Sequence, residues 1–417
     1  MIASILRLST LFIGVAVLLT GHGLNLAIVP LQAQLLGWTS IEIGFLSSTY
    51  FIGFLLGCYS VPPLVSRIGH IRTFATLTAL MTAAILALSL SNYYLLWMVL
   101  RLLAGVAIVG LYLVIESWLN EQVTSDVRGG VLAIYTATVL LGLACGQLLL
   151  NAADLESNKL FVISAMLIVL AAIPVCMTRS PQPSQIPRAK FSPLLVLRTS
   201  RAAATGSFIG GMVAGSIYGL GPVYGLQRGL DVMSISFMMS LAILGGATAQ
   251  LPLGRFSDRI DRRLVILTCM LTGSVVCGVA FIAPPALVPF IMFLFGASVM
   301  SIYALSLALA SDNVKAGSFL QVGTGLLMIN SIGSIVGPLI TSQFMFRLGP
   351  QYFFASILLI LISGAVLVLY TIRTKPAAEH SGADFAPAST ASAQAALQMH
   401  PSAEPDAEDK EAETEIL

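Results

Sequence analysis

Two charged residues lie deep in one apolar segment of the sequence, Arg101 and Glu116, fifteen positions apart. Placing a charge within a membrane-spanning segment is costly, so such residues are expected to serve a function. In an α-helix this separation is roughly 22 Å along the axis and about 60° around it, which leaves both charges near one face. Gly105, Ile108 and Tyr112 occupy the same face between them. Because lipid would tolerate neither charge, we expect this face to look into a central cavity.

Each of the two charges has an alternative interpretation. A partly desolvated carboxyl group at Glu116 could carry protons, and it is our first candidate for that role. The apolar segment ends near Leu119, about one turn further on, so Glu116 could instead be a charge at the membrane interface. Arg101 could balance the charge of a substrate or tune a proton path, or it could be an anchor that hydrogen-bonds helix ends.

Polar residues in other apolar segments add candidates for the same pathway. The stretch "TGHGLN" contains His22 and Asn25, three residues apart and therefore on one helical face. Histidine titrates near neutral pH, so His22 is the second candidate proton carrier, unless it is a packing histidine with satisfied hydrogen bonds. Tyr218 and Tyr303 contribute hydroxyl groups from later segments. The apolar segments of the second half contain no deep charge, which favours a neutral or an amphipathic, aromatic substrate over a multiply charged one.

The composition indicates that membrane-spanning helices hold these residues. The 417-residue chain is 57% hydrophobic and 10% charged, whereas soluble domains carry about 25% charged residues. Apolar runs of about 20 residues, each long enough to cross a bilayer, recur along it. We therefore predict an all-α membrane protein with twelve transmembrane helices in two six-helix bundles. The predicted spans are 8–30, 40–61, 73–91, 94–118, 129–150, 159–178, 202–224, 232–253, 264–283, 286–310, 318–342 and 351–372.

The segment 179–201 divides these spans six plus six. It contains four prolines and five basic residues without an acid, and we predict a cytoplasmic linker between bundles at 1–178 and 202–372. Residues 373–417, rich in Ala, Ser, Pro and Glu, are predicted to be a disordered acidic tail. Of the 21 Lys and Arg residues, seventeen lie in the predicted inner segments and three in the outer loops. This bias predicts a multi-pass protein of the inner cell membrane with both termini in the cytoplasm.

The two halves of the chain repeat each other. At an offset of 192 residues Ser48 corresponds to Ser240, and at an offset of 191 Tyr112 corresponds to Tyr303. Each half has six predicted spans that start inside, so the repeat is parallel, about an axis along the membrane normal. Two packed bundles with a site between them are expected from such a repeat. The two tyrosines could then face one another across the cavity.

A charged turn after the eighth predicted span reads "GRFSDRIDRR", and its counterpart in the first half reads "PPLVSRIGHIR". The pattern resembles the loop signature of the major facilitator superfamily, a glycine followed four residues later by Asp-Arg and then by glycine and basic residues. In that family the acid of this loop helps to latch the inner face of the transporter. The resemblance assigns the latch motif to Arg67, Gly69, Gly254, Asp258 and Arg259. The first copy lacks the acid, and an ordinary positive-inside turn is the alternative.

Glycines extend the resemblance. "RLLAG" resembles the family's Arg-x-x-x-Gly signature, and two later segments have GxxxG spacing. Small residues at this spacing let membrane helices pack closely, and we expect them also to form the surface on which the bundles pivot. These glycines are Gly105, Gly142, Gly146, Gly333 and Gly337. With "VIESWLN", "GSIYGLGPVYG" and "QLPLGRFSDR", nearly all of residues 8–372 is similar to the YcaD-type bacterial permeases.

The residues and the resemblance together predict a secondary active transporter of a small neutral or amphipathic solute, working by alternating access and coupled to protons. The sequence has no GxxxxGK(S/T) loop for ATP and no visible nucleophile–base or metal-ligand set. We therefore expect no enzyme activity, no cofactor and no metal. The expected partners are the solute, protons and the lipid bilayer, without nucleic acid, and the protein is expected to be a monomer. The alternative is a transporter-like membrane sensor or accessory protein that binds a ligand without transporting it.

Overall fold

The computed structural model describes residues 9–122, 125–177, 193–312, 319–374 and 385; the predicted linker over 179–192 and most of the predicted tail lie outside them. The described secondary-structure elements are all helices. The helices of the first half are α2 (Ser9–Leu35), α3 (Ser40–Ile68), α4 (His70–Leu90), α5 (Tyr94–Gln122), α6 (Ser125–Leu148), η1 (Leu149–Ala152), α7 (Lys159–Leu170) and α8 (Ala172–Cys176). Those of the second half are α9 (Pro193–Thr199), α10 (Arg201–Gln227), α11 (Val232–Ser257), α12 (Arg262–Ile282), η2 (Pro285–Leu287), α13 (Val288–Val299), α14 (Ile302–Ser311), α15 (Phe319–Leu348) and α16 (Tyr352–Thr374).

Eleven helical stretches of the described chain are long and apolar enough to cross a membrane. They coincide with eleven of the twelve predicted spans, and three of them consist of more than one element: α6 continues as η1, α7 continues as α8, and η2, α13 and α14 form one stretch. The seventh predicted span, 202–224, is occupied by α10, which has 27 residues but is not among the eleven. α10 is rich in glycine, alanine and serine, and almost all of its residues are buried. A helix covered by other helices does not need the apolar side chains that a lipid-facing helix needs.

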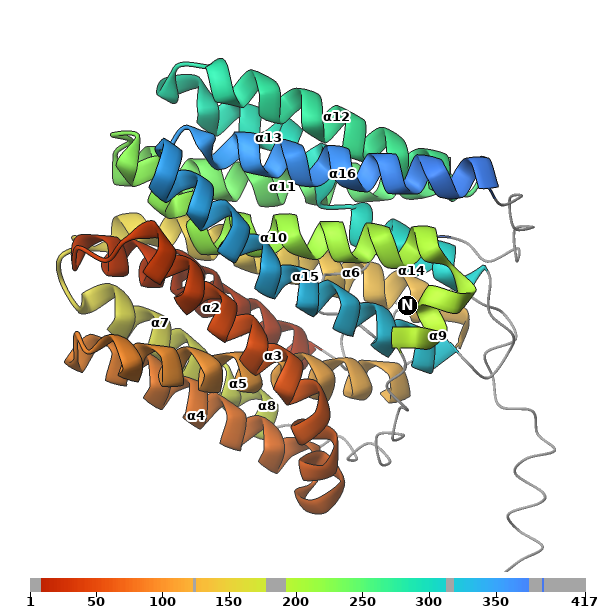
Figure 1. Cartoon of the computed structure of the whole chain (residues 1–417). Coiled ribbons are helices and arrows are strands. Elements are labelled where there is room, and N and C mark those ends of the chain that lie inside the picture. The colour runs from red at the N-terminus through yellow and green to blue at the C-terminus, as the bar shows by residue number, and fades with distance from the viewer. Residues whose placement is uncertain (1–8, 123–124, 178–192, 313–318, 375–384, 386–417) are drawn as a thin grey trace, which may run out of the picture.

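Figure 1 shows the helices lying side by side, with most of those from the first half (red to yellow) below and those from the second half (green to blue) above. The two sets meet where α3 packs on α15 and α6 packs on α11, and α10 also contacts α2 and α3. Large hydrophobic side chains such as Leu90, Val275 and Phe290 are exposed, as expected for helices that face lipid.

The sequence repeat extends to the packing of helices. A Cβ atom at Gly53 on α3 would lie 2.0 Å from the carbonyl oxygen of Leu102 on α5. A Cβ atom at Gly245 on α11 would likewise lie 2.0 Å from the carbonyl oxygen of Phe293 on α13. The two glycines are related by the offset of 192 residues, and the two carbonyl groups by the offset of 191. Equivalent helices therefore approach each other at equivalent backbone positions, as close as glycine allows.

The turns that precede α3 and α11 are also built alike. Gly37 and Gly229 have positive φ angles of 81° and 77°, a conformation that glycine adopts without a Cβ clash. Two residues later, Thr39 and Asp231 are the N-cap residues of the two helices. The backbone N–H of Thr39 donates to Oε2 of Glu42 at 2.7 Å and Oγ1 of Thr39 accepts from the Glu42 N–H at 3.3 Å, which is the capping box that the Thr-x-x-Glu spacing predicts. The two helices therefore start at equivalent places.

Candidate functional site

A cavity of about 580 Å³, a volume that includes the solvent-open space at its mouth, lies between the two halves. Its wall is built by α2, α3, α5 and α6 from the first half and by α10 and α15 from the second, from residues near the middle of these helices. Such a midplane position between repeats is where transporters of this kind of architecture bind their substrates. The lining residues are His22, Leu26, Tyr50, Phe51, Phe54, Tyr112, Leu143, Ala214, Tyr218, Asn330, Ser331 and Ser334.

The cavity includes some of the pathway residues expected from the sequence and omits others. His22, Tyr112 and Tyr218 line it. The remaining four are buried elsewhere in the interior; they are Asn25, Arg101, Glu116 and Tyr303. None of the described residues that line the cavity carries a carboxylate. The wall is therefore aromatic, hydroxyl-bearing and free of negative charge.

Behind the cavity wall, Arg101 is held by residues of α2 and α3. Its guanidinium carbon lies 4.3 Å from the centroid of the Tyr50 ring, an arrangement that attracts the cation to the ring face. Nη1 of Arg101 donates to Oδ1 of Asn25 at 3.4 Å. The hydroxyl oxygen of Tyr50 lies 3.2 Å from Nε2 of His22. Tyr50 and His22 both line the cavity. Arg101 therefore lies behind two lining residues, and its positive charge is close to the cavity.

This cluster is incompletely satisfied. Arg101 is 4% exposed, and the ion pairs of the described residues do not include it. Among the described residues, Nε of Arg101, Nδ2 of Asn25 and Nδ1 of His22 are buried without a hydrogen-bond partner. Buried charges are normally paired and buried polar atoms are normally hydrogen-bonded. The cluster therefore contains polar atoms beside the cavity that can still form hydrogen bonds.

Tyr50 was not proposed from the sequence. It is one aromatic residue within an apolar run, and nothing in the sequence indicates that the charge on α5 stacks on its ring. The glycines supply a partial signal. A Cβ atom at Gly105 would lie 2.0 Å from the carbonyl oxygen of Tyr50, so the close approach that Gly105 permits is an approach to Tyr50. Arg101 lies about one turn before Gly105 on the same helix, which places it next to the same residue.

Glu116 lies buried near the end of α5, with 1% of its surface exposed, and it does not line the cavity. Its carboxyl group interacts electrostatically with Tyr112 on its own helix, with Tyr135 on α6 and with Tyr303 on α14. Tyr303 belongs to the second half of the chain. Glu116 is therefore buried in the protein interior, close to residues of both halves.

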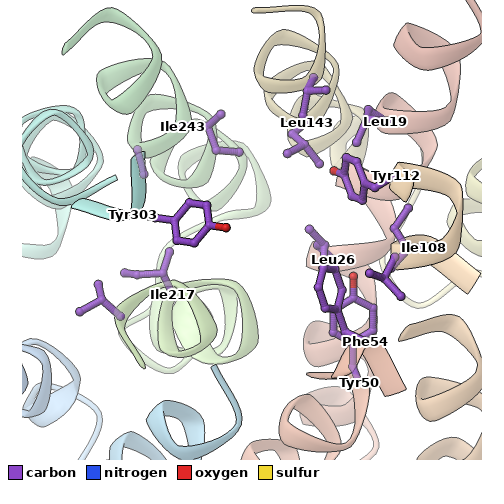
Figure 2. Close-up of a cluster of buried hydrophobic side chains, with 14 of the residues drawn as sticks. Leu19, Leu26, Tyr50, Phe54, Ile108, Tyr112, Leu143, Ile217, Ile243 and Tyr303 are labelled. Atoms are coloured by element: carbon purple, nitrogen blue, oxygen red, sulfur yellow. The ribbon is translucent and has the colours of Figure 1, made fainter. Parts of the chain in front are cut away.

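The repeat-related tyrosines lie on opposite sides of the space between the halves. Figure 2 shows the hydroxyl ends of Tyr112 and Tyr303 directed toward one another. Tyr112 lines the cavity, whereas Tyr303 is 1% exposed and lies between Ile217 and Ile243. The pair thus marks the place where the two halves present equivalent side chains to each other.

The latch motif of the second half forms an ion-pair network within its own half. Asp258, at the end of α11, pairs with Arg262 at 2.9 Å. Arg262 also pairs with Asp312 at 2.8 Å, and its Nη1 donates to Oγ of Ser257 at 3.1 Å. Arg259 is exposed. Asp312 was not proposed from the sequence, where its signal is an acid directly after an apolar span. The network joins α11, α12 and α14.

The first half carries a different set of contacts at the equivalent place. Arg67 is exposed near the end of α3, and Gly69 ends this helix with a φ angle of 85°. His70 occupies the position equivalent to Arg262, and its Nε2 lies 3.1 Å from Oγ of Ser117. A histidine–serine hydrogen bond therefore lies where the second half has its ion pairs.

Gly254 and Asp258 also contact a residue of the predicted tail. The backbone N–H of Phe385 donates to both carboxylate oxygens of Asp258 at 3.1 Å. A Cβ atom at Gly254 would lie 2.0 Å from Cδ1 of the Phe385 ring. The missing side chain at Gly254 therefore makes room for this ring at the end of α11, and the motif acid caps the tail backbone there.

The remaining motif glycines join helices within each half. A Cβ atom at Gly146 would lie 2.3 Å from a carbonyl oxygen of α2, and one at Gly337 would lie 2.0 Å from a carbonyl oxygen of α10. Gly142 and Gly333 approach the same two helices one turn earlier. These glycines therefore fix α6 on α2 and α15 on α10, and their close contacts do not cross between the halves.

Two side-chain hydrogen bonds between the halves lie near one end of the helices. Nε2 of Gln227, the last residue of α10, donates to Oε1 of Gln34 on α2 at 2.7 Å. Nδ2 of Asn151 in η1 donates to Oγ of Ser236 on α11 at 2.8 Å. These residues lie close to the α2–α3 and α10–α11 turns, so this end of the molecule is sealed by polar contacts.

Comparison with known proteins agrees with this architecture. Residues 11–327 and 229–402 match the Major Facilitator Superfamily. The chain is 30% identical over 366 residues to the MFS-type transporter YcaD of Escherichia fergusonii, a match that covers 86% of this chain and 94% of the relative. The crystal structure of the nucleoside transporter NupG aligns with a TM-score of 0.70 at 13% identity, over 89% of this chain and 98% of that one.

A bacterial homolog of the human lysosomal transporter Spinster, in an inward-facing and occupied conformation, aligns with a TM-score of 0.71 at 15% identity, over 88% of this chain and 97% of that one. At such identities the two solved structures establish the fold alone. The family match, which spans most of the sequence, and the YcaD-type relative carry the assignment. The chain belongs to the major facilitator superfamily of membrane transporters.

Proposed function

We propose that this protein is a secondary active transporter that carries a small neutral or amphipathic organic solute through the central cavity by alternating access. The observation that carries the proposal is the cavity itself, whose wall comes from both halves of the repeat. A solute bound there contacts both halves at once, so its binding can bias their relative position. The aromatic and hydroxyl-bearing wall suits a solute with apolar and polar groups.

The moving bodies in this proposal are the bundles 1–178 and 202–372, joined by the linker 179–201. The bias of basic residues supports an inner-membrane protein with the linker, both termini and the 373–417 tail in the cytoplasm. With this orientation, the end sealed by the Gln34–Gln227 hydrogen bond is the outer end. Transport by alternating access then requires this seal to open.

Protons are the proposed driving ions, with Glu116 as the first candidate carrier and His22 as the second. Glu116 is buried and interacts electrostatically with Tyr303 across the boundary between the halves. A change in its charge would therefore be felt by both halves, which is what coupling to the rocking movement requires. His22 lines the cavity and could exchange a proton with a bound solute.

A ligand-stabilisation screen of the purified protein, followed by uptake of the best stabiliser into proteoliposomes, tests the proposal. We expect the solute to accumulate above equilibrium under a pH gradient and a protonophore to abolish the accumulation. A stabiliser that binds but never crosses the membrane would contradict transport and would favour a membrane sensor or accessory protein.

The role of Glu116 is tested separately. Glu116→Gln is expected to bind the solute and to let it equilibrate, but not to concentrate it under a pH gradient. Glu42→Gln is the control, because Glu42 belongs to a helix cap and its loss should leave coupling intact. If Glu116→Gln still concentrates the solute, the proton carrier lies elsewhere, and His22→Gln is the next variant to measure.

A further inference from the structure

We infer that the solute is an aromatic or similarly flat monocarboxylate that also carries a neutral hydrogen-bond donor, such as a hydroxyl group. The inference rests on the proposed transport function and narrows its substrate class. It follows from the Arg101–Tyr50–His22 cluster at the cavity and from the acceptor groups that α15 presents to the same cavity.

Arg101 sets the charge preference of the cavity. The ion pairs of the described residues do not include Arg101, although the side chain is 4% exposed. An unpaired buried cation is costly, and an incoming anion offsets that cost as it binds. A second cation would be repelled, and the described lining residues include no carboxylate to balance it. The cavity therefore favours a single negative charge, placed at the wall where Tyr50 and His22 connect to Arg101.

The Tyr50–His22 contact bears on which groups at that wall can donate. The guanidinium group over the Tyr50 ring withdraws electron density from it, which makes the Tyr50 hydroxyl group a better donor. The hydroxyl oxygen lies 3.2 Å from Nε2 of His22, and on this ground we infer the tautomer in which Tyr50 donates to Nε2. A neutral imidazole that accepts at Nε2 carries its proton at Nδ1. Nδ1 has no partner among the described residues. It is therefore left as a donor for a carboxylate oxygen, with the charge of Arg101 behind it.

Helix α15 presents hydrogen-bond acceptors to the cavity. Oγ of Ser331 donates to the carbonyl oxygen of Leu327 at 2.8 Å. Oγ of Ser334 lies 3.0 Å from the carbonyl oxygen of Asn330 and 3.1 Å from that of Gly211 on α10. Each serine proton is thereby used, which leaves the oxygen as an acceptor. Nδ2 of Asn330 donates to the carbonyl oxygen of Ser207 at 3.0 Å, and its Oδ1 can accept. These groups can therefore receive a donor from the solute.

Apolar side chains line the cavity together with these polar groups. They are Phe51 and Phe54 on α3, Leu26 on α2 and Leu143 on α6. Aromatic rings favour flat partners through stacked or edge contacts. A solute that satisfies all of these groups has a carboxylate, a ring and a hydroxyl group.

A matched set of small molecules tests the inference on the unaltered protein. The set consists of 4-hydroxyphenylacetate, its amide, tyramine and phenylacetate, which change the charge or remove the hydroxyl group at nearly constant shape. Affinities are measured by calorimetry on the full chain in lipid nanodiscs. We expect the hydroxy acid to bind roughly ten- to a hundredfold more tightly than the amide, the range that a charged hydrogen bond provides. Tyramine should bind weakest, and phenylacetate several-fold more weakly than the hydroxy acid.

Equal or tighter binding of the amide or of tyramine, or no binding by any of the four, would overturn the inference. Transport of a neutral or cationic solute would leave the proposed function intact while removing this substrate class. Tight binding of the hydroxy acid without any crossing of the membrane would support this substrate class and contradict the proposed transport function.

Two variants locate the charge preference. Arg101→Gln should reduce the advantage of the hydroxy acid over its amide to about threefold or less, whereas Arg101→Lys should keep part of it because the charge remains. Arg67→Gln is the matched control, since Arg67 is exposed far from the cavity. If Arg101→Gln keeps the full advantage, Arg101 is not the source of the charge preference. If this variant does not fold, the ligand set on the unaltered protein still decides.

Discussion

The hydroxyl group of Ser48 on α3 donates a hydrogen bond to the carbonyl oxygen of Ile335 on α15 at 2.7 Å, across the boundary between the two halves. The repeat supplies the reciprocal bond, from Ser240 on α11 to the carbonyl oxygen of Ala144 on α6 at 2.9 Å. The two serines differ by 192 positions and the two acceptors by 191. The two equivalent bonds therefore connect the two pairs of helices that pack across the boundary between the halves, α3 with α15 and α6 with α11.

Removing both bonds should open the sealed end. A neutral hydrogen bond contributes about 1 kcal/mol, so Ser48→Ala combined with Ser240→Ala should raise the ratio of open to closed states by roughly thirtyfold. The distance between spin labels at Ser91→Cys and Ala283→Cys, which follow α4 and α12 at this end, measures the ratio in a background without the native cysteines. Thr268→Ala is the control, since its hydroxyl group bonds within one helix. An unchanged distance distribution in the double variant would refute the role of the pair.

Close backbone contact should make Gly296 intolerant of a side chain. A Cβ atom there would lie 1.8 Å from the carbonyl oxygen of Ala242, and backbone cannot move aside as a side chain can. Gly296→Ala should lower the free energy of unfolding by about 1–3 kcal/mol, seen as a lower melting temperature of the purified protein. At Gly278 the nearest atom would be Cδ1 of Leu358 at 3.7 Å. Gly278→Ala should therefore melt at the same temperature or higher, and an equal loss in both variants would contradict the packing argument.

The network around Arg262 should be a stabilising element of the second half. The Arg262 side chain is 3% exposed and pairs with Asp258 and with Asp312. Arg262→Met would leave a buried carboxylate without its partner, which costs about 3 kcal/mol. The melting temperature should fall clearly, whereas Arg259→Met, at an exposed position, should change it little. Similar melting temperatures of the two variants would show that the network adds no net stability.

The contact between Phe385 and Gly254 should protect the tail from proteolysis. Phe385 packs where Gly254 has no side chain, and its N–H is bonded to Asp258. Gly254→Ala should displace the Phe385 ring. The rate of chymotrypsin cleavage after Phe385 should then rise about threefold or more, because cleavage follows local opening. Arg255→Ala, at an exposed neighbouring position, is the control. A cleavage rate that is unchanged by Gly254→Ala would exclude the contact as a tether of the tail.

The local features of the fold were predictable from the sequence. Hydropathy depends on composition within one helix, so the apolar runs indicated eleven of the spans. The capping box at Thr39 and Glu42 is set by residues three positions apart. The repeat was visible because equivalent residues recur at a constant offset. α10 occupies the seventh predicted span, 202–224, although it is not among the eleven apolar stretches, since a helix enclosed by protein does not need the hydropathy of a lipid-facing one.

The sequence by itself therefore determined a membrane-embedded helical chain with an internal repeat and with charged residues inside its apolar spans, which indicate a function. Only the tertiary structure decided which residues meet. Arg101 lies on Tyr50, and Arg262 pairs with Asp312 fifty positions away. It also decided that His22 and Tyr112 line the cavity while Glu116 and Tyr303 do not. The physical reason is that the hydropathy of a span fixes its place in the bilayer but not its rotation or its neighbours, which packing between helices sets.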